Sequence, residues 1–310
     1  MLPPPLTHRL ALGLEALSPA LSFGCRLDAA GTLIEYRIAP SWVRVERVSY
    51  EAADGRLAEP IFAAMAELTN RYRTRRAARG ATGLALPEVN IKVIDGRVVI
   101  RPLARLGSRE LVTDAMLMAG EAAARWAIAN GVAMPFATQL PPDEIRAPED
   151  LAGMYAYRRL FRPSQTKGVP EPHAGLGLDA YVRATSPLRR YQDLLAHQQI
   201  RAALHAGTVL PTAALAERYG VADVASAVVR RAERLSNQHW KLVYLQQNPH
   251  WEGEAVVVDL EERKAAVIIP ELAFETRVKL QGGMAPNQRL RLKVREVDLA
   301  DASAYFRVLD

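Results

Sequence analysis

The sequence predicts an α+β fold in which mixed strands and helices are followed by a small all-β barrel. Three patterns support this prediction: hairpin signals in the first hundred residues, long stretches of helical periodicity in the middle, and a series of short strand-like runs at the end. At 310 residues the chain exceeds what one core usually fills. We therefore expect one large domain and one small one.

Two hairpins are predicted near the N-terminal end. The first spans residues 21–38 and has Gly31 in its turn. The second spans residues 89–101 and turns at Asp95-Gly96. This dipeptide tolerates the positive backbone angles of a tight turn better than most pairs. Strand pairing should therefore recur in the first hundred residues.

A helix is predicted over residues 60–79, because proline opens the stretch, apolar residues recur at helical spacing and Gly80 follows. Its C-terminal half is basic and contains Arg71, Arg73, Arg75, Arg76 and Arg79. Cations suit the negative end of a helix dipole, so a solvated basic cap is the simpler interpretation. Contact with phosphate is the alternative.

Two longer helices are also predicted. Residues 108–130 begin with a serine cap, are apolar on most faces and precede Gly131, which indicates a largely buried central helix. Residues 212–247 keep a helical period up to Asn248-Pro249. We expect the second helix to connect the two domains.

Five strand-like runs complete the chain: residues 251–260, 265–269, 276–280, 290–297 and 304–309. Five short strands in about sixty residues are typical of a small closed barrel of the OB type, which binds single-stranded nucleic acid. Trp251, Phe274, Tyr305 and Phe306 would offer stacking surfaces to bases. Aromatic residues in so small a barrel are more often part of the core, and we expect core packing to dominate.

Composition narrows the class of protein. The chain is 49% hydrophobic and 24% charged, as in soluble globular proteins. It lacks both an apolar stretch of about 20 residues and the layout of a secretion signal, so we expect a cytoplasmic protein with no membrane partner. The single cysteine, Cys25, fits a reducing compartment and is expected in the core. A net charge of +6, mostly from arginine, makes nucleic acid a plausible partner, although genome base composition also enriches arginine.

Residues 181–197 contain the candidate chemistry. A helix is predicted to open at Ser186, with Pro187 at its first position. Arg189 and Arg190 would then lie in the first turn, where the helix dipole disfavours each cation by about 0.3–1 kcal/mol. A bound phosphate would offset this cost.

A polar stripe along the same helix is the second feature of this segment. Arg189, Asp193 and His197 follow at four-residue steps, so the stripe can join a guanidinium to a carboxylate and then to an imidazole. The alternative is an exposed arginine pair with an ordinary salt bridge to the carboxylate four residues on. Spacing alone does not decide between the two.

The motif around these arginines resembles the signature of the ribonuclease II/R family. The matching residues are Pro172-His-Ala-Gly-Leu-Gly-Leu-Asp-Ala-Tyr181, then Thr185-Ser-Pro-Leu-Arg-Arg-Tyr-Gln-Asp193 and His197. The resemblance covers the whole chain. It implies the C-terminal part of an RNB catalytic domain over residues 1–210, a helical bridge over 211–248, and an S1-like OB-fold domain that binds RNA over 249–310.

The family resemblance also implies an activity and site residues. Members hydrolyse single-stranded RNA processively from the 3′ end, require magnesium and release nucleoside monophosphates. Arg189 matches the arginine that holds the scissile phosphate, and Arg190 and Tyr191 match positions with an RNA-contacting or structural role. Tyr50 matches a tyrosine near the 3′-terminal nucleotides. Asp114 falls where the family has a glutamate that contacts the terminal ribose.

Two departures from the family pattern affect these expectations. Leu86 replaces an aromatic residue that clamps the last bases in some members, and stacking of that kind is worth about 1–3 kcal/mol per base. The four aspartates that hold magnesium in the family would lie upstream of Met1, so no metal ligands are expected in this chain. An upstream-encoded segment is therefore an expected partner, beside single-stranded RNA.

Three functional interpretations stay open. They differ in whether this chain alone is an enzyme. The first is a hydrolytic exoribonuclease whose catalytic carboxylates are encoded upstream. The second is a non-catalytic protein of the same family that binds single-stranded RNA. The third is a protein-interaction scaffold, for which only the helix over residues 212–247 offers a sequence feature.

Overall fold

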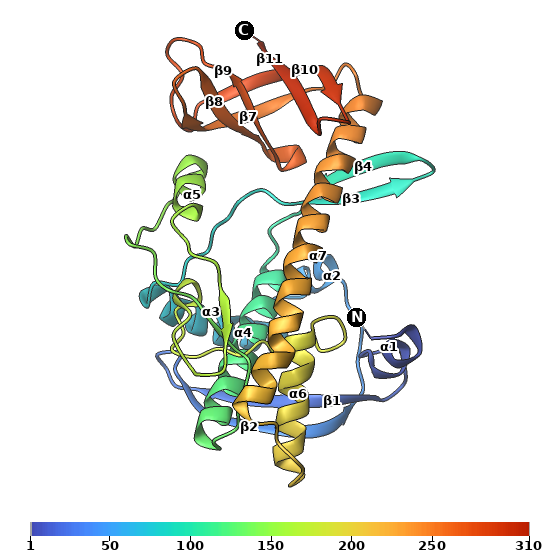
Figure 1. The fold of residues 1–310 in the computed structure, drawn as a ribbon, viewed down its shortest axis with the longest axis vertical. Helices are drawn as coiled ribbons and strands as arrows, with labels where there is room; N and C mark the ends of the chain where they lie inside the picture. The colour runs from blue at the N-terminus through green and yellow to red at the C-terminus, as the bar shows by residue number, and fades with distance from the viewer. Residues whose placement is uncertain (1, 310) are drawn as a thin grey trace. The chain divides into compact units, whose positions relative to one another are not determined.

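The computed structural model describes residues 2–309, and their helices and strands fall into two units (Figure 1). The first unit comprises residues 2–82, 105–142 and 162–225; the second comprises residues 83–104, 143–161 and 226–309. Mixed helices and strands precede a five-stranded antiparallel barrel. The predicted α+β class is therefore confirmed.

The first unit begins with helix α1 (Pro4–Leu10) and a hairpin of β1 (Ser18–Leu27) and β2 (Leu33–Val43), which confirms the first predicted hairpin. The Asp28 carboxylate accepts a hydrogen bond from the Thr32 amide at 2.8 Å and closes the turn. Gly31 has a φ of +80°, and a Cβ there would collide with the backbone carbonyl of Arg71. The turn therefore needs glycine both for its conformation and for this close approach.

Two helices form the centre of the first unit: α3 (Pro60–Ala78) and α4 (Gly107–Ala129). Both were predicted, and ten of the 23 residues of α4 are buried. Around them lie α2 (Tyr50–Asp54), β5 (Phe136–Thr138), β6 (Gln165–Lys167), the 3-10 turn η1 (Ala174–Leu176) and α6 (Tyr191–Leu204). The long helix α7 (Thr212–Gln247), also predicted, contributes its residues up to 225 to this unit.

The core of the first unit lies between α4, α6 and the β1–β2 hairpin. Small side chains of α4, including Ala123 and Ala127, allow Val182 and Ile200 to approach closely. Cys25 is partly buried against the neighbouring cluster that contains Met118, and burial raises its pKa to about 11. The thiol is therefore protonated at neutral pH and acts as an apolar packing group.

The second unit contains a hairpin and the barrel. Strands β3 (Val89–Ile94) and β4 (Arg97–Pro102) pair through the predicted turn, where Asp95 and Gly96 have φ values of +50° and +74°. The barrel strands are β7 (Glu252–Leu260), β8 (Lys264–Ile269), β9 (Phe274–Lys279), β10 (Arg289–Asp298) and β11 (Ser303–Leu309). They pair in the order β11-β10-β7-β8-β9, and the 3-10 turn η2 (Pro270–Leu272) links β8 to β9. The predicted OB-type barrel is confirmed.

Aromatic residues of the barrel belong mainly to its interior, as expected. Trp251 and Phe274 are buried and Phe306 packs against them, with the Trp251 and Phe306 rings edge to face at 5.8 Å. Tyr305 is the exception, because its side chain is 55% exposed. No helix in the described part of the chain is long and apolar enough to cross a membrane.

Candidate functional site

The candidate site centres on the arginine loop, which we define as residues 183–190. The prediction that a helix opens at Ser186 is wrong, because α6 begins at Tyr191. Residues 187–189 form a turn in which the Arg189 and Arg190 amides donate to the Ser186 carbonyl at 3.2 and 3.0 Å. Arg190 then has an extended backbone, with φ −121° and ψ 122°, which separates the turn from the helix. The two arginines therefore precede the helix rather than lie in its first turn.

Asp193 holds this loop in place through hydrogen bonds. Its carboxylate is fully buried and accepts hydrogen bonds from the Ser186 amide at 2.8 Å and from the Arg190 guanidinium at 2.7 and 2.9 Å. A carboxylate that accepts from one guanidinium at two points gives a strong and directional ion pair. The expected contact between Arg189 and Asp193 is therefore wrong, since the Asp193 carboxylate pairs with the neighbouring Arg190.

His197 supports the loop on the other side. Its Nε2 lies 2.7 Å from the Ala184 carbonyl oxygen, so this nitrogen must donate. Burial lowers the pKa of His197, while the nearby Asp193 carboxylate opposes that shift. The imidazole is therefore a neutral donor at pH 7 that holds the backbone of the loop.

The loop is also tied to the beginning of the chain. The Leu2 amide donates to the Leu188 carbonyl at 2.8 Å, and the Leu2 carbonyl accepts from the Thr7 hydroxyl at 3.1 Å. Among residues 2–309, by contrast, the Arg189 side chain has no hydrogen bond or ion pair, and it is exposed. The site thus presents an unneutralised guanidinium on a backbone fixed on both sides of it.

Tyr50 and Tyr191 are the exposed aromatic candidates. Tyr50 opens α2, is 37% exposed and lies with its ring under the Arg109 guanidinium at 4.5 Å. Its carbonyl accepts from the Ser108 hydroxyl at 2.7 Å, which joins α2 to the start of α4. Tyr191 is 44% exposed at the first position of α6, directly after the arginine loop. Tyr191 offers an exposed ring for stacking, and Tyr50 offers the part of its ring that Arg109 does not cover.

Asp114 is buried between α3 and α4. It accepts from Arg73 Nε at 2.9 Å and forms a second ion pair with Arg76, whose side chain is also buried. Nearby, Glu121 accepts from the Tyr72 hydroxyl at 2.7 Å and lies 3.5 Å from Arg75. The burial and the hydrogen bond to Glu121 raise the pKa of Tyr72.

These ion pairs correct the expectation of a solvated basic cap on α3. Arg75 and Arg76 are directed into the first unit, because Asp114 and Glu121 lie seven residues apart on the face of α4 that packs on α3. Arg79 reaches the Gly177 carbonyl at 3.2 Å and pairs with Asp179. The arginines of α3 are thus engaged by protein groups rather than free for phosphate.

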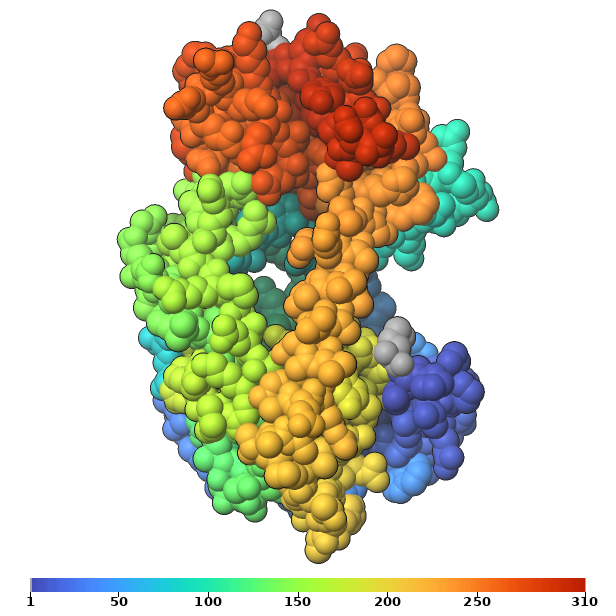
Figure 2. Space-filling model, in the orientation of Figure 1, coloured from blue at the N-terminus to red at the C-terminus, as the bar shows by residue number. Residues whose placement is uncertain are grey.

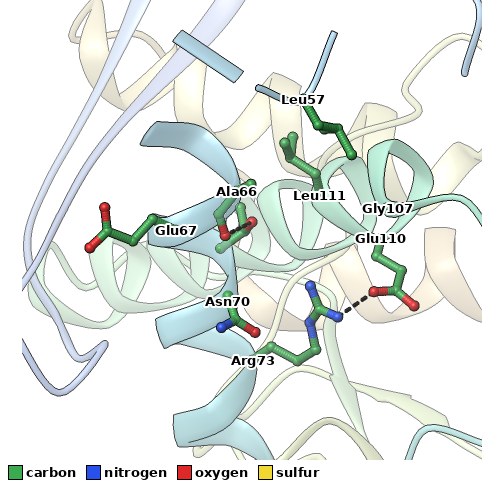
Figure 3. Close-up of a pocket in the computed structure, with 9 residues that line it drawn as sticks. Leu57, Ala66, Glu67, Asn70, Arg73, Gly107, Glu110 and Leu111 are labelled. Atoms are coloured by element: carbon green, nitrogen blue, oxygen red, sulfur yellow. Dashed lines mark hydrogen bonds and ion pairs between the residues drawn. The ribbon is translucent and has the colours of Figure 1, made fainter. Parts of the chain in front are cut away.

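A shallow pocket lies where α3 approaches the start of α4 (Figure 3). Its volume is about 360 Å³, and its lining includes Leu57, Asn70, Arg73, Glu110 and Leu111. Arg73 pairs with Glu110 across it. Since this guanidinium also pairs with Asp114, its charge is already balanced by two carboxylates.

Comparison with known proteins identifies the family. The RNB domain matches residues 1–154 and 149–206, and the RNase II-type exonuclease C-terminal S1 domain matches residues 251–309. The chain belongs to the RNB family of ribonucleases. Together the two matches cover most of this RNB-family chain, including the arginine loop and the barrel.

Individual relatives agree with this assignment. An uncharacterized ribonuclease of Synechocystis is 33% identical over 100% of this chain and 49% of its own length. RNase R of Mycoplasma genitalium in its apo form has the same fold, with a TM-score of 0.81 and 16% identity over 99% of this chain and 60% of that chain. The same enzyme in complex with ribose-methylated single-stranded RNA gives a TM-score of 0.78 at 16% identity, over 94% of this chain and 58% of that chain. This RNB-family chain spans about half the length of the curated relatives it matches.

The metal requirement of RNB-family enzymes finds no counterpart in the described residues. Nowhere between residues 2 and 309 do three or more His, Cys, Asp or Glu side chains gather so that they could hold an ion. The buried carboxylates of Asp114, Glu121 and Asp193 are each neutralised by arginine. The residues present therefore do not fit a magnesium site.

The sequence did not reveal which contacts position the arginine loop. Asp193 was singled out, but as a partner of Arg189 instead of Arg190. The role of Leu2 gave no signal, because a backbone amide pairing with a distant carbonyl leaves no trace in residue type. The contact of His197 with Ala184 could not be predicted either, because its acceptor is also a backbone carbonyl.

Asp193→Asn is expected to lower the free energy of unfolding by about 2 kcal/mol, because a buried amide replaces the anion that Arg190 and the Ser186 amide require. Urea-induced unfolding measures this difference. Asp179→Asn is the matched control: Asp179 pairs with Arg79 at the surface, where ion pairs contribute about 0–1 kcal/mol. Equal losses in the two variants would contradict the role given to Asp193.

His173 is expected to make stability depend on pH. It is 8% exposed, and burial lowers its pKa from 6.5 to about 4. As pH falls, His173 is therefore protonated in the unfolded chain before it is protonated in the folded chain. About 3 kcal/mol of the free energy of unfolding is lost as pH falls from 6.5 to 4. Unfolding titrations between pH 7 and pH 4 measure this loss, which should shrink in His173→Gln. If the pH dependence of the free energy of unfolding is the same in His173→Gln and in the parent, the pKa of His173 does not change on folding.

Proposed function

We propose that this chain supplies the phosphate-binding arginine and the RNA-binding barrel of a hydrolytic 3′-to-5′ exoribonuclease, which releases nucleoside monophosphates processively from single-stranded RNA. The observation that carries the proposal is the exposed Arg189 guanidinium, which has no ion pair or hydrogen bond among residues 2–309 and stands on a fixed backbone. Membership of the RNB family supports it. The RNase R complex with single-stranded RNA supports the choice of substrate.

Arg189 is proposed to contact the scissile phosphate. A guanidinium forks onto two phosphate oxygens and stabilises the charge that develops on them during phosphoryl transfer. Because the loop is held by Asp193 and Leu2, little reorganisation is needed when RNA arrives. Arg190 would act mainly by keeping Asp193 in place, with direct RNA contact as its second role.

The aromatic candidates and Asp114 are proposed RNA contacts of a different kind. Tyr50 and Tyr191 would stack on bases through their exposed rings. Contact between Asp114 and the terminal ribose requires its carboxylate to exchange Arg73 or Arg76 for a hydroxyl. The structure therefore favours Tyr50 and Tyr191 over Asp114 as direct contacts.

Magnesium is the cofactor we propose for the complete enzyme, with ligands outside residues 2–309. Hard divalent cations need several oxygen ligands on one scaffold, and the described residues do not gather such a set. We derive no catalytic step through the metal from this chain. An upstream-encoded segment is the proposed source of the ligands, and the cytoplasm, expected from the sequence, remains the proposed location.

A non-catalytic protein that binds single-stranded RNA is the second candidate. The absence of a carboxylate cluster from residues 2–309 favours it. In that case Arg189 would bind a phosphate without cleavage.

Degradation of a 5′-labelled single-stranded RNA separates the two candidates. The purified chain and the same chain extended upstream in frame are compared, each with magnesium, with EDTA and as Arg189→Ala. Stepwise shortening that needs magnesium and Arg189 supports the exoribonuclease. RNA binding without shortening in either form supports the non-catalytic protein, and absence of binding contradicts both.

A further inference from the structure

We propose that the barrel binds single-stranded RNA on the outer face of β10 and β11, and not on the outer face of β7, β8 and β9, because helix α5 (Leu151–Arg158) occupies the latter. The proposal rests on the RNA-binding function given above and assigns it a surface. In OB folds, oligonucleotides commonly bind on the face of the second and third strands, which are β8 and β9 here. All the residues involved belong to the second unit.

Helix α5 covers the usual face through apolar contacts. Ala152 and Tyr155 of α5 are buried against Val258 of β7 and against Ala266 and Ile268 of β8. These barrel residues point outward, since their neighbours Val257, Ala265 and Val267 fill the barrel interior. Strand β8 is consequently buried on both faces. The outward side chains of β8 and of Val258 on β7 are therefore closed to RNA.

Polar contacts hold α5 in this place. The Tyr155 hydroxyl donates to Glu275 of β9 at 2.6 Å, and Arg159 donates to Asp259 of β7 at 2.8 Å. The Ala152 amide donates to the Asn287 side chain at 2.9 Å. Helix α5 is therefore attached at both ends and along its length.

Ion pairs surround the covered face. Asp259 and Glu275 flank α5, and Glu261 and Glu262 occupy the turn between β7 and β8. Arg277 of β9 is paired with Glu261 at 2.9 Å. Arg158 pairs with Glu275 at 3.2 Å and Arg159 pairs with Asp259 at 2.8 Å, so the cations on this side are already engaged by protein carboxylates.

Helix α5 packs on β7 and β8 and leaves outward residues of β10 and β11 exposed. Interior residues Leu290, Leu292 and Val294 alternate with outward residues along β10. The outward set contains Arg289, Arg291 and Lys293 on β10 and Tyr305 and Arg307 on β11. Lys293 lies opposite Arg307 in the register, and Tyr305 is 55% exposed. In Figure 2 the red atoms of these two strands form part of the visible surface.

Carboxylates of β7 and β10 lie beside these cations. Glu254 pairs with Arg289 at 3.1 Å, and Glu252 pairs with Lys293 at 2.9 Å and with Arg291 at 3.4 Å. Exposed pairs of this kind contribute little and exchange readily for phosphate. Glu296 and Asp298 also lie on this face, opposite Tyr305 and Ser303 in the register. The fit to RNA therefore rests on the exposed Tyr305 ring flanked by cations in weak surface pairs, and not on a large net charge.

Fluorescence anisotropy with a labelled oligouridylate in EDTA tests the proposal over a series of salt concentrations. In Arg289→Gln/Arg307→Gln, the slope of log affinity against log salt should fall by about 1.4, since each phosphate contact with a single strand contributes about 0.7. Tyr305→Ser should weaken binding about tenfold. The matched control, Arg277→Gln/Lys279→Gln, removes two exposed cations of β9 and should leave both quantities unchanged.

Cross-linking identifies the surface independently of affinity. An oligonucleotide that contains 4-thiouridine should attach to β11, and the attachment should disappear in Tyr305→Ser. Cross-links to β8 or β9, or a slope that falls in the β9 control and not in the β10–β11 variant, would overturn the inference alone. Failure of the unmodified chain to bind the oligonucleotide would overturn the proposed function as well.

Discussion

Arg189→Ala is expected to slow RNA hydrolysis by the active form of the protein about 10²–10³-fold, the usual effect of removing one fixed group that stabilises developing charge. The loss should appear mainly in kcat, because this guanidinium acts most strongly when charge builds up on the phosphate. Single-turnover degradation of a 5′-labelled RNA measures it. Arg189→Lys should recover only part of the rate, since an ammonium cannot fork onto two oxygens.

Stability separates this role from a structural one. Arg189 makes no contact with protein groups in residues 2–309 that its removal would break, so the free energy of unfolding of Arg189→Ala should stay within about 0.5 kcal/mol of the parent. Arg190→Ala, the adjacent control, deprives buried Asp193 of its partner and should lose stability. If Arg189→Ala hydrolyses RNA at the parent rate, Arg189 is not the phosphate ligand.

Asp114→Ala is expected to lower the free energy of unfolding by about 3–5 kcal/mol, because it leaves the buried Arg76 guanidinium without its carboxylate. Denaturant unfolding measures this loss. The double variant Asp114→Leu/Arg76→Met should recover much of it, since neither charge remains in the interior.

RNA binding decides whether Asp114 has a second role. If the carboxylate contacts the terminal ribose, Asp114→Asn should weaken binding of RNA more than binding of DNA of the same sequence, because only RNA has the 2′-hydroxyl. An equal effect on both nucleic acids, together with a large loss of stability, would assign Asp114 to the interior alone. Glu67→Ala, which removes an exposed ion pair with Arg71 on α3, is the control for general destabilisation.

Local patterns carried the parts of the fold that were predicted correctly. The Asp95-Gly96 turn, the proline at the start of α3 and the alternation in the barrel strands each depend on a few neighbouring residues. The family resemblance was equally local, since one continuous motif contains Arg189 and Asp193. Prediction therefore succeeded where the determinants are close in sequence.

Side-chain contacts that periodicity does not encode explain the failures. Ser186 and Pro187 have the residue types of a helix start, yet the Ser186 amide binds the Asp193 carboxylate and the helix begins later. The arginines at the end of α3 look like a solvated cap until α4 brings Asp114 against them. Neither outcome can be read from periodicity, because the first depends on a hydrogen bond between a side chain and the backbone within residues 186–193 and the second on which helix packs beside α3.

The burial of β8 on both faces limits how the barrel can be exchanged between proteins of this family. A barrel grafted onto another protein at residue 249 would arrive without α5 and would expose Val258, Ala266 and Ile268 as an apolar strip. Segment 143–161 and the barrel should therefore have been inherited together, although residues 162–225 of the first unit separate them along the chain. Exchange of barrels between relatives should succeed only when the donor's α5 counterpart moves with its own barrel.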